Sequence, residues 1–422
     1  LFTHHSRYWH LLRLYTDRSG LEPLVTPLGQ RGRTRLRTRD TSTFFLDAEG
    51  RVKVPDRGSF VGRRRDLQQL LRELRPADPT TGPQAALLTG MGGLGKSSLT
   101  ARLLDRSRTT HNQHAVWVGK IDTTAVQNLT QRLNLDPDVD QLVNDLLSRD
   151  SPLRDRLRFI LDGPLADIPC LFTFDDFEDG NLDDDGHGGH LCTPDALEVI
   201  EAFGTAINRA GSPSRIIITS RYDFPLPTSL NVVRHPVGQL HGADLEKKLR
   251  LTVNLGPTST LDDAVRQRAI AASAGIPRLL ERLDSLVNEP GDLDAQLATI
   301  EQTQVEYREE LLLHQLLERQ TPNVRRTIAL AAIYEIAVPL EAILALAPER
   351  SIADDVEAAV RSGLIQAGLH PNTGETRYLV SPLLSPLVAD VVEHLSASDL
   401  RQAQERAAEF LYQLWVKNPD SE

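Results

Sequence analysis

Short apolar runs alternate with amphipathic, helix-length segments between residues 85 and 237 of the chain. This alternation predicts parallel strands joined by helices, because each crossover between parallel strands needs a helix that covers one face of the sheet. The predicted strands are Ala85–Thr89, Ala115–Val118, Leu171–Phe174, Arg215–Thr219 and Asn231–Arg234. The pattern therefore predicts an α/β domain in which helices sandwich a parallel sheet.

After residue 240 the strand pattern mostly ends, and helical periodicity replaces it. Leu245, Leu249 and Val253 recur at helical spacing, and Ala264–Ala274 and Pro277–Val287 also fit helices. We therefore expect a small helical domain after the sheet domain.

A further group of helices includes one that begins at Thr321–Pro322, an N-cap followed by proline at the first helical position. Downstream, Leu364–Ala367 and Arg377–Val380 flank Asn372–Thr373–Gly374, which is typical of a β-hairpin. Helices followed by such a hairpin predict a winged-helix domain. The segment Leu369–Arg377 carries only one Arg and one Glu, which argues against DNA binding by this hairpin.

The composition excludes several classes of protein. Two cysteines in 422 residues are too few for a disulfide scaffold or a cysteine-rich zinc module. No run approaches the roughly 18 apolar residues of a membrane helix, and no basic-then-apolar signal segment opens the chain. We therefore expect a cytoplasmic protein without a membrane partner.

Positive charge concentrates near the N-terminus, although the net charge is −11. Residues 1–80 carry 16 basic and 9 acidic side chains, whereas the remainder carries 31 and 49. A nucleic-acid or anionic-lipid arm is one interpretation. We favour a solvated linker and no nucleic-acid partner, because aromatic residues are not interleaved and the rest of the chain would repel phosphate.

The segment Gly90–Ser97 has the sequence GMGGLGKS and matches the phosphate-binding pattern G-x-x-x-x-G-K-[ST]. A predicted strand precedes it, and a predicted helix, Ser97–Leu104, follows it. Glycines let successive backbone N–H groups face phosphate oxygens, and the helix N-terminus adds partial positive charge. Lys96 is expected to reach the β- and γ-phosphates of a nucleotide, and Ser97 to ligate Mg²⁺.

A phosphate-binding loop also needs a carboxylate that holds the metal at the end of a neighbouring strand. The strand Leu171–Phe174 ends in Asp175 and Asp176. We expect Asp175 to bind Mg²⁺ directly or through water, and Asp176 to orient or deprotonate the water that attacks the γ-phosphate. Glu178 is the weaker candidate for this base.

Together these residues resemble the NB-ARC branch of the STAND ATPases, which includes plant resistance proteins, apoptosome ATPases and bacterial relatives. The resemblance covers about residues 58–400. The phosphate loop matches the family's in its doubled glycine and its serine pair; the matching residues are Gly92, Gly93, Gly95, Lys96, Ser97 and Ser98.

Three further motifs carry the resemblance. Phe60-Val61-Gly62-Arg63 followed by Asp66 resembles the family motif that lies against the adenine, although the family usually has Glu at the last position. The segment Ile216–Arg221 resembles the family's sensor strand, in which Arg221 would contact the γ-phosphate. Gly275-Ile276-Pro277 resembles the helical-domain motif whose Pro277 packs near the base.

The winged-helix segment departs from the family pattern. The family often places a His after the hairpin that touches the β-phosphate of ADP, and Ser381 occupies that position here. A serine donates one hydrogen bond but carries no charge, so the resemblance predicts a weaker ADP-locked resting state. His370 lies on the hairpin tip and is a poor substitute.

Both ends of the chain indicate missing neighbours. The chain begins with Leu1, so we expect it to be cut from a longer polypeptide. Trp9–Tyr15 is faintly similar to the end of a CHAT-type, caspase-like effector domain, and Leu400–Val416 predicts the start of a helical sensor region that would detect an unknown trigger. The expected domains are residues 1–55 as a tail or linker, 56–238 as the nucleotide-binding domain, 239–300 as the helical domain, 301–398 as the winged-helix domain and 399–422 as the start of a C-terminal helical region.

The resemblance implies a molecular switch that binds ATP or ADP with Mg²⁺, hydrolyses ATP slowly or not at all, and forms a homo-oligomer on activation. It also implies a role in bacterial immunity or regulated cell death. The alternatives are a transcription regulator of the same ATPase class, whose DNA-binding region lies outside this chain, and a motor-type ATPase.

His187, His190 and Cys192 have the residue types of a metal site, but we favour a solvated acidic insertion there.

Overall fold

The computed structural model describes most of the chain from residue 44 onward. The described residues are 44–45, 50, 52–54, 58–75, 82–107, 113–122, 126, 129–130, 132–133, 135–187, 189–287, 292–370, 373–381, 384, 388 and 397–414. Two segments singled out from the sequence lie outside them: residues 31–39, which carry five arginines of the basic N-terminal region, and the CHAT-like Trp9–Tyr15. Within the described part, no helix is long and apolar enough to span a bilayer.

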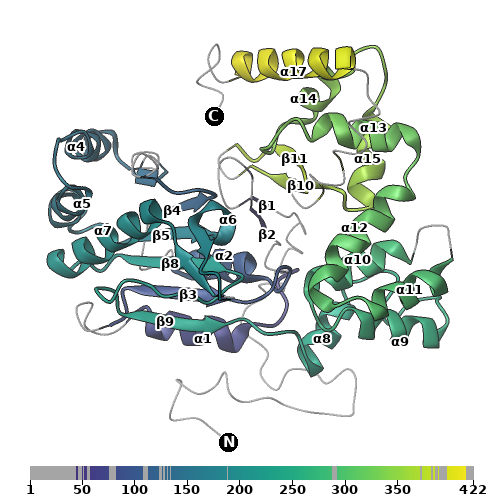
Figure 1. Cartoon of the computed structure of the whole chain (residues 1–422), viewed down its shortest axis with the longest axis horizontal. Coiled ribbons are helices and arrows are strands. Elements are labelled where there is room, and N and C mark those ends of the chain that lie inside the picture. The colour runs from purple at the N-terminus through teal and green to yellow at the C-terminus, as the bar shows by residue number, and fades with distance from the viewer. Residues whose placement is uncertain are drawn as a thin grey trace, which may run out of the picture. The chain divides into compact units, whose positions relative to one another are not determined.

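A five-stranded, fully parallel sheet forms the first part of the structure, as the sequence pattern predicted (Figure 1). Its strand order is β4-β5-β8-β3-β9. The bounds are β3 Ala85–Thr89, β4 Gln113–Val118, β5 Cys170–Asp175, β8 Arg215–Ser220 and β9 Val232–Pro236. Every predicted strand is present, within two residues at each end.

Alternating side chains divide the sheet between two helical layers. Along β3, Ala86 and Leu88 pack with α1 and α2, whereas Ala85 and Leu87 pack with α4, α5 and α7. Side chains alternate along a strand, so helices on both faces require apolar residues at every position. The helix bounds are α1 Arg64–Glu73, α2 Lys96–Ser107, α4 Pro137–Leu147, α5 Leu153–Asp162 and α7 Pro194–Ala210.

The strand that bears the paired acids is not the direct neighbour of the strand that enters the glycine loop, which corrects the sequence-based expectation. β8 lies between them and pairs with both, with Thr89 opposite Ser220 and Phe174 opposite Ile218. The carboxyl end of β8 therefore lies between the glycine loop and the acids. This order places Thr219 to Arg221 at the centre of the site.

A helical segment follows the sheet. Its elements are α8 Gly242–Leu249, α9 Asp263–Ala272, α10 Pro277–Leu286, α11 Leu293–Gln302, η2 Val305–Tyr307, α12 Arg308–Glu318 and α13 Pro322–Ala331. The Thr321 side chain accepts from the Val324 N–H, so the predicted N-cap is confirmed. Val253 does not extend α8 as its spacing predicted, because this helix ends at Leu249 and Val253 is exposed.

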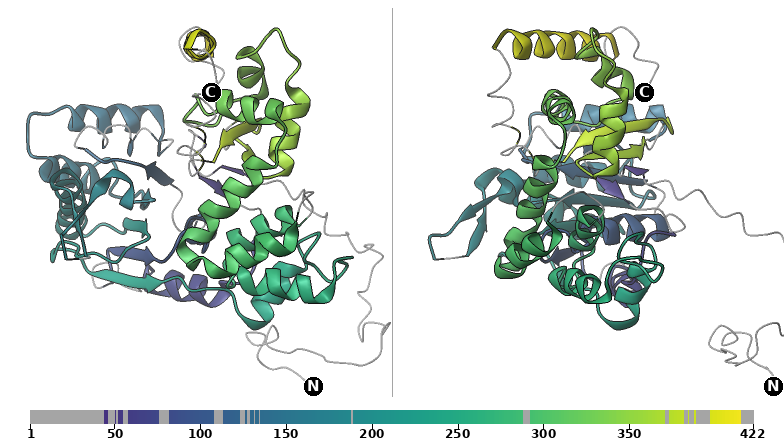
Figure 2. Two further views of the ribbon diagram at one scale, coloured as in Figure 1. Left: turned by 45° about the vertical axis from the view of Figure 1, so that its right-hand side comes forward. Right: turned by 90° about the vertical axis from the view of Figure 1, so that its right-hand side faces the viewer.

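The last part contains the predicted hairpin, made by β10 Ile365–Leu369 and β11 Thr376–Val380 (Figure 2). Asn372 of the predicted turn lies outside the described residues. Helices α14 Leu340–Ala345, α15 Ala353–Arg361 and α17 Ala397–Tyr412 complete this part, and Arg406 of α17 donates to the Leu346 carbonyl (2.9 Å).

Part of the segment expected to be a linker is structured. Within residues 1–55, β1 Phe44–Phe45 and β2 Lys53–Val54 form an antiparallel pair, and β1 lies parallel to β10. The resulting sheet has the order β11-β10-β1-β2. Two-residue strands carry too little periodicity to be recognised in a sequence.

Candidate functional site

The loop between β3 and α2 has backbone angles that only glycine adopts readily. Gly90, Gly93 and Gly95 have φ values of 143°, 74° and 90°. A Cβ on Gly90 would lie 2.6 Å from the Val237 carbonyl oxygen, which is too close for any side chain. The loop therefore depends on glycine both for its conformation and for its packing, and it leads directly into the N-terminus of α2.

Lys96, the first residue of α2, is buried under this loop. Its ammonium donates to the carbonyls of Gly90 (2.8 Å) and Met91 (3.3 Å). Burial lowers the pKa of Lys96, and the charges of Glu178, Asp176 and Asp175 oppose that shift. The loop thus holds a desolvated cation at its centre, which favours an anionic ligand.

Asp175 ends β5 in a fully enclosed position. Its Oδ1 accepts from the Thr219 hydroxyl at 2.6 Å. Burial and the neighbouring charge of Asp176 raise the pKa of Asp175 to about 7, while the hydroxyls of Thr219 and Ser97 and the charge of Lys96 oppose the rise. Among the described residues, no group hydrogen-bonds to its buried Oδ2.

This donor set fits a magnesium ion. An unsatisfied buried carboxylate oxygen is costly, and a divalent cation removes that cost. Asp175 and the hydroxyl of Ser97 are the oxygen ligands that would hold it. When bound, the ion would supply charge neutralisation for phosphate oxygens.

Asp176 and Glu178 have different environments, although both follow β5. Asp176 has a positive φ of 48°, its N–H donates to the Thr219 hydroxyl (3.0 Å), and its side chain is exposed. Glu178 pairs with Arg221 (Nε to Oε1, 3.2 Å) and also accepts from the Arg221 N–H (3.1 Å). Glu178 therefore holds Arg221 in place, and Asp176 is the carboxylate left facing solvent near the loop.

Arg221 lies against the glycine loop. A Cβ on Gly92 would meet the Arg221 guanidinium at 3.5 Å. The interpretation of Ile216–Arg221 as a sensor strand requires a guanidinium group beside the glycine loop, where it would contact the γ-phosphate. The geometry brings together Gly92, Lys96, Ser97, Asp175, Asp176 and Arg221 at the carboxyl edge of the sheet.

The first turn of α10 closes over the loop from the other side. The Arg278 N–H donates to the Gly93 carbonyl (3.3 Å), and its guanidinium pairs with Glu309 of α12 (3.3 Å). A Cβ on Gly93 would lie 2.8 Å from the Arg278 Cβ. Sequence analysis missed Arg278 and Glu309; a cation directly after Pro277, in the first turn of a predicted helix, was the available signal.

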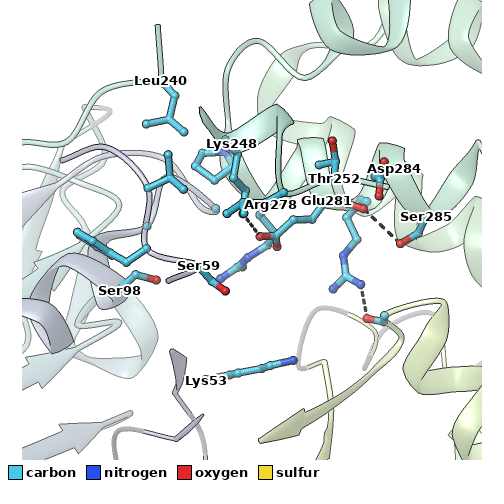
Figure 3. A pocket seen from close by; sticks show the side chains of 18 of the residues that line it. Lys53, Ser59, Ser98, Leu240, Lys248, Thr252, Arg278, Glu281, Asp284 and Ser285 are labelled. Carbon is cyan, nitrogen blue, oxygen red and sulfur yellow. Dashed lines mark hydrogen bonds and ion pairs between the residues drawn. The ribbon is translucent and has the colours of Figure 1, made fainter. Parts of the chain in front are cut away.

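A pocket of about 520 Å³ opens beside the loop (Figure 3). Seven of the residues singled out from the sequence line it: Phe60, Val61, Arg63, Gly93, Gly95, Ser98 and Pro277. Apolar side chains such as Leu240 and Leu251 share the wall with charged residues of α10. An apolar wall next to a phosphate-binding loop is the arrangement that holds a nucleotide base.

Arg63 has a structural role in this wall. It occupies a left-handed conformation (φ 57°) and donates to the carbonyls of Leu94 (3.0 Å) and Gly238. Burial lowers the pKa of Arg63, and Asp66 and Asp244 oppose the shift. Arg63 thus ties the segment before α1 to the glycine loop.

Ser381 lies apart from the pocket. Its side chain is buried, and its N–H donates to the Leu364 carbonyl (3.3 Å). Gly363, Ile365 and Gln366 are the hairpin residues that line the pocket instead. These residues lie in or just before β10, whereas the family resemblance concerned the position after β11 and gave no signal for them.

The insertion after the acids forms a small hairpin, with β6 Leu182–Asp184 paired to β7 His190–Cys192. His190 stacks on Tyr222 with ring centroids 3.7 Å apart. No group of three or more His, Cys, Asp or Glu side chains suited to a metal occurs in the part of the chain that the structure describes.

Replacing Asp175 with asparagine is expected to raise the thermal stability of the nucleotide-free chain and to abolish the effect of Mg²⁺ on nucleotide binding. The raised pKa means that the folded, nucleotide-free chain favours the protonated form of Asp175. The stability that this group contributes is therefore fully present below about pH 4 and is lost as the pH rises through about 7. The variant side chain does not ionise, so at about pH 8 the variant should melt at a higher temperature than the wild type. Added Mg²⁺ should no longer strengthen its nucleotide binding.

Asp179→Asn, at an exposed position near the same strand end, is the matched control. Thermal unfolding at about pH 5 and pH 8 measures the first effect, and calorimetry with and without Mg²⁺ measures the second. A variant that melts lower than the wild type at about pH 8, or keeps the Mg²⁺ dependence, would contradict this account of Asp175.

The sequence and the fold were compared with those of known proteins. Residues 59–219 match the family model described as the AAA ATPase domain. No curated protein matches the sequence. In fold, the chain is similar to a Signal Transduction ATPase with Numerous Domains (STAND) protein with a tetratricopeptide repeat sensor from Pyrococcus horikoshii, at a TM-score of 0.51 and 14% identity. The match covers 84% of this chain and 45% of that one, so this chain spans less than half of its length.

Two further likenesses to solved structures are weaker. Drosophila ORC bound to DNA has a TM-score of 0.35 and 15% identity, covering 79% of this chain and 96% of that chain. The ORC2 protein of Aeropyrum pernix has a TM-score of 0.35 and 12% identity, covering 88% and 99%. The family match and the STAND-like fold agree on a P-loop ATPase-type fold, and the NB-ARC and CHAT assignments stay predictions.

Proposed function

We propose that the chain binds ATP or ADP with Mg²⁺ and acts as a nucleotide-controlled molecular switch. One observation carries the proposal: a single pocket is lined by the glycine loop, by the first turns of α10 and by β10. These three segments are far apart in the sequence. A ligand that fills this pocket would contact all three and would therefore favour one arrangement of them.

Each part of the site has a defined task in this proposal. The loop N–H groups and Lys96 bind the phosphates, and Asp175 with Ser97 holds the magnesium ion. The base lies against the apolar wall formed by Phe60, Val61 and Pro277. Asp176 faces the solvent beside the loop, where it would orient a water, and slow hydrolysis or none is consistent with its exposure.

The switch needs contacts that differ between diphosphate and triphosphate. Arg221 and Arg278 flank the loop at Gly92 and Gly93, so a γ-phosphate placed between them would be bound by two guanidinium groups. Both are held by carboxylates, Glu178 and Glu309, which orient them without fully neutralising the site. An added phosphate would compete for these ion pairs and alter the position of α10 and α12.

The movable parts in this proposal are the helical domain at 239–300 and the winged-helix domain at 301–398. Arg282 of α10 donates to the Gly363 carbonyl just before β10, which couples the two. Their release would expose surfaces for homo-oligomerisation. The tetratricopeptide repeat sensor named for the Pyrococcus horikoshii protein supports, as part of the proposal, a trigger-sensing role for the helical region expected to begin at residue 399.

We further propose an immune or cell-death role in bacteria, based on the resemblance of the motifs. A transcription regulator of the same ATPase class is the second candidate, and a motor-type ATPase is the third. Steady-state turnover of several molecules per second without any trigger would favour the motor. Reading the full-length gene separates the first two: an upstream protease or TIR-like domain would favour defence, and a helix-turn-helix would favour regulation.

The proposal is tested by the nucleotide that the protein carries. We expect purified protein, once denatured, to release ADP or ATP at close to one molecule per chain, identified by chromatography. ADP would show that a resting lock exists with Ser381 in place of the usual His. Protein that releases no nucleotide and binds neither ATP nor ADP at millimolar concentration would refute the proposal.

A further inference from the structure

One lysine of the pocket comes from a strand that precedes the P-loop domain. Lys53, on β2, lines the pocket (Figure 3). Gly93, Pro277 and Gln366 line the same pocket. Sequence analysis placed this residue in a linker. Burial lowers the pKa of Lys53, and the charge of Glu281 partly opposes the shift. The lysine therefore belongs to the wall of a site that the sequence motifs did not include.

The position of β2 is set by packing on two sides. Val54, with 2% of its surface exposed, lies in one apolar cluster with Ala101 of α2, the helix that begins at Lys96. β2 pairs with β1, and β1 pairs with β10, with Phe44 opposite both Val54 and Leu369. The β1–β2 pair therefore connects the phosphate-loop helix to the hairpin of the last domain.

Lys53 differs from the other cations of the pocket. Each of those has a protein acceptor: Arg63 bonds Leu94 and Gly238, Lys248 pairs with Glu281, Arg278 pairs with Glu309, and Arg282 bonds Gly363. Among the described residues, none is a hydrogen-bond or ion-pair partner of the Lys53 ammonium. A half-buried ammonium without an acceptor is unfavourable unless a ligand supplies one.

The chemistry of that ligand follows from the pocket. An ammonium is a compact cation with three donors, and it prefers a concentrated negative charge such as a phosphate group. The neighbouring guanidinium groups add positive potential, which strengthens the preference for an anion. The glycine loop, whose Gly93 and Gly95 line the same pocket, would place a nucleotide's phosphates within it.

We propose that Lys53 binds a phosphate group of the nucleotide and so makes the β1–β2 pair part of the switch. The inference rests on the proposed function, because it assigns a further contact at the same site. Bound nucleotide would hold β2 against α2 and β10, and its loss would release β2. Nucleotide occupancy would thereby determine whether the β1–β2 pair stays packed against α2 and β10.

The test compares ADP with adenosine in the whole chain. Lys53→Met keeps the length of the side chain and removes its charge, and Lys53→Arg restores a cation. Lys247→Met is the matched control, because Lys247 does not line the pocket and its side chain is 60% exposed. By calorimetry, we expect ADP affinity to fall about 10- to 100-fold in Lys53→Met, as for loss of a charged hydrogen bond. Adenosine affinity should be unchanged, and Lys53→Arg should recover most of the loss.

A second measurement follows the β1–β2 pair itself. Hydrogen exchange at the amides of residues 44–45 and 53–54 should slow when ADP is added to the wild type, and should slow much less in Lys53→Met. If Lys53→Met does not fold, Lys53→Gln serves the same purpose.

The outcomes separate this inference from the proposed function. A wild type that binds ADP together with a Lys53→Met variant of equal ADP affinity overturns the inference alone. Equal losses for ADP and adenosine also overturn it, because they show a packing role without phosphate contact. A wild type that binds no nucleotide overturns the proposed function, and the inference with it.

Discussion

Replacing Lys96 with alanine is expected to lower the affinity for ADP and ATP at least about 100-fold, which corresponds to about 2.7 kcal/mol. The variant loses a buried cation that would bind the phosphates through charge-assisted hydrogen bonds. In the wild type, the ammonium also bonds the carbonyls of Gly90 and Met91. Without it, these two carbonyl oxygens would face the bound anion unpaired. Both effects act against phosphate binding. Calorimetric titration with Mg²⁺–ADP measures the change.

Lys120→Ala is the control for Lys96→Ala, because Lys120 is exposed and does not line the pocket. We expect the control to bind ADP like the wild type. Both variants should keep the wild-type circular dichroism spectrum, and this measurement checks that each of them folds. Unchanged ADP affinity in Lys96→Ala would contradict the role assigned to the glycine loop.

Gly275→Ala is expected to destabilise the fold by about 3 kcal/mol or more. Gly275 has a φ of 70°, and a Cβ there would lie 2.4 Å from the Leu240 carbonyl oxygen. The Gly275 carbonyl also accepts from the Leu240 N–H at 2.8 Å, so neither backbone can move without breaking this contact. Displacement of the segment would shift Pro277 from the pocket and weaken nucleotide binding as well. The midpoint of urea unfolding and calorimetry with ADP measure the two effects.

Gly374→Ala measures the conformational part of that cost, so the difference between the two variants gives the steric part. Gly374 has nearly the same φ, 72°, but a Cβ there would meet no atom within 4 Å. Only the cost of the left-handed conformation applies, about 1 kcal/mol. Equal shifts of the urea midpoint in the two variants would show that the close approach of Leu240 and Gly275 is not maintained in solution.

Much of the fold was predictable because its elements have strong local signals. The three central strands of the parallel sheet, β3, β5 and β8, are buried along almost their whole length, so they stand out as mostly apolar runs. Helix starts such as Thr321–Pro322 were recognisable from capping chemistry. The order of the strands in the sheet was not predictable, because the pairing of β8 between β3 and β5 depends on long-range contacts that no local pattern encodes.

The candidate site was predictable where its residues belong to recognisable motifs, which include the glycine loop and the pocket residues Phe60, Val61 and Pro277. The motif residues Lys96, Asp175 and Arg221 are close together at one edge of the sheet, as their positions after strands indicated. Lys53 and Gln366 reach the pocket from segments with no recognisable motif. They do so because β1 pairs with β10, a contact that joins residues more than 300 positions apart.

Asp175 shows where physical chemistry adds to motif recognition. The motif predicted a metal ligand, and the structure adds a reason for its affinity, namely a buried carboxylate with one unsatisfied oxygen. Magnesium binding and proton binding compete at this oxygen. Nucleotide binding that depends on Mg²⁺ should therefore weaken as the pH falls below about 7.

The central claim is that the phosphates of a purine nucleotide occupy the loop Gly90–Ser97 while its base lies against Pro277. A crystal structure of the chain with Mg²⁺ and ADP tests it most directly. We predict the β-phosphate beside the Lys96 ammonium, the metal between Ser97 and Asp175, and the base on the apolar wall. A loop that stays empty at millimolar ADP and Mg²⁺, or a nucleotide bound at some other surface, would contradict the account.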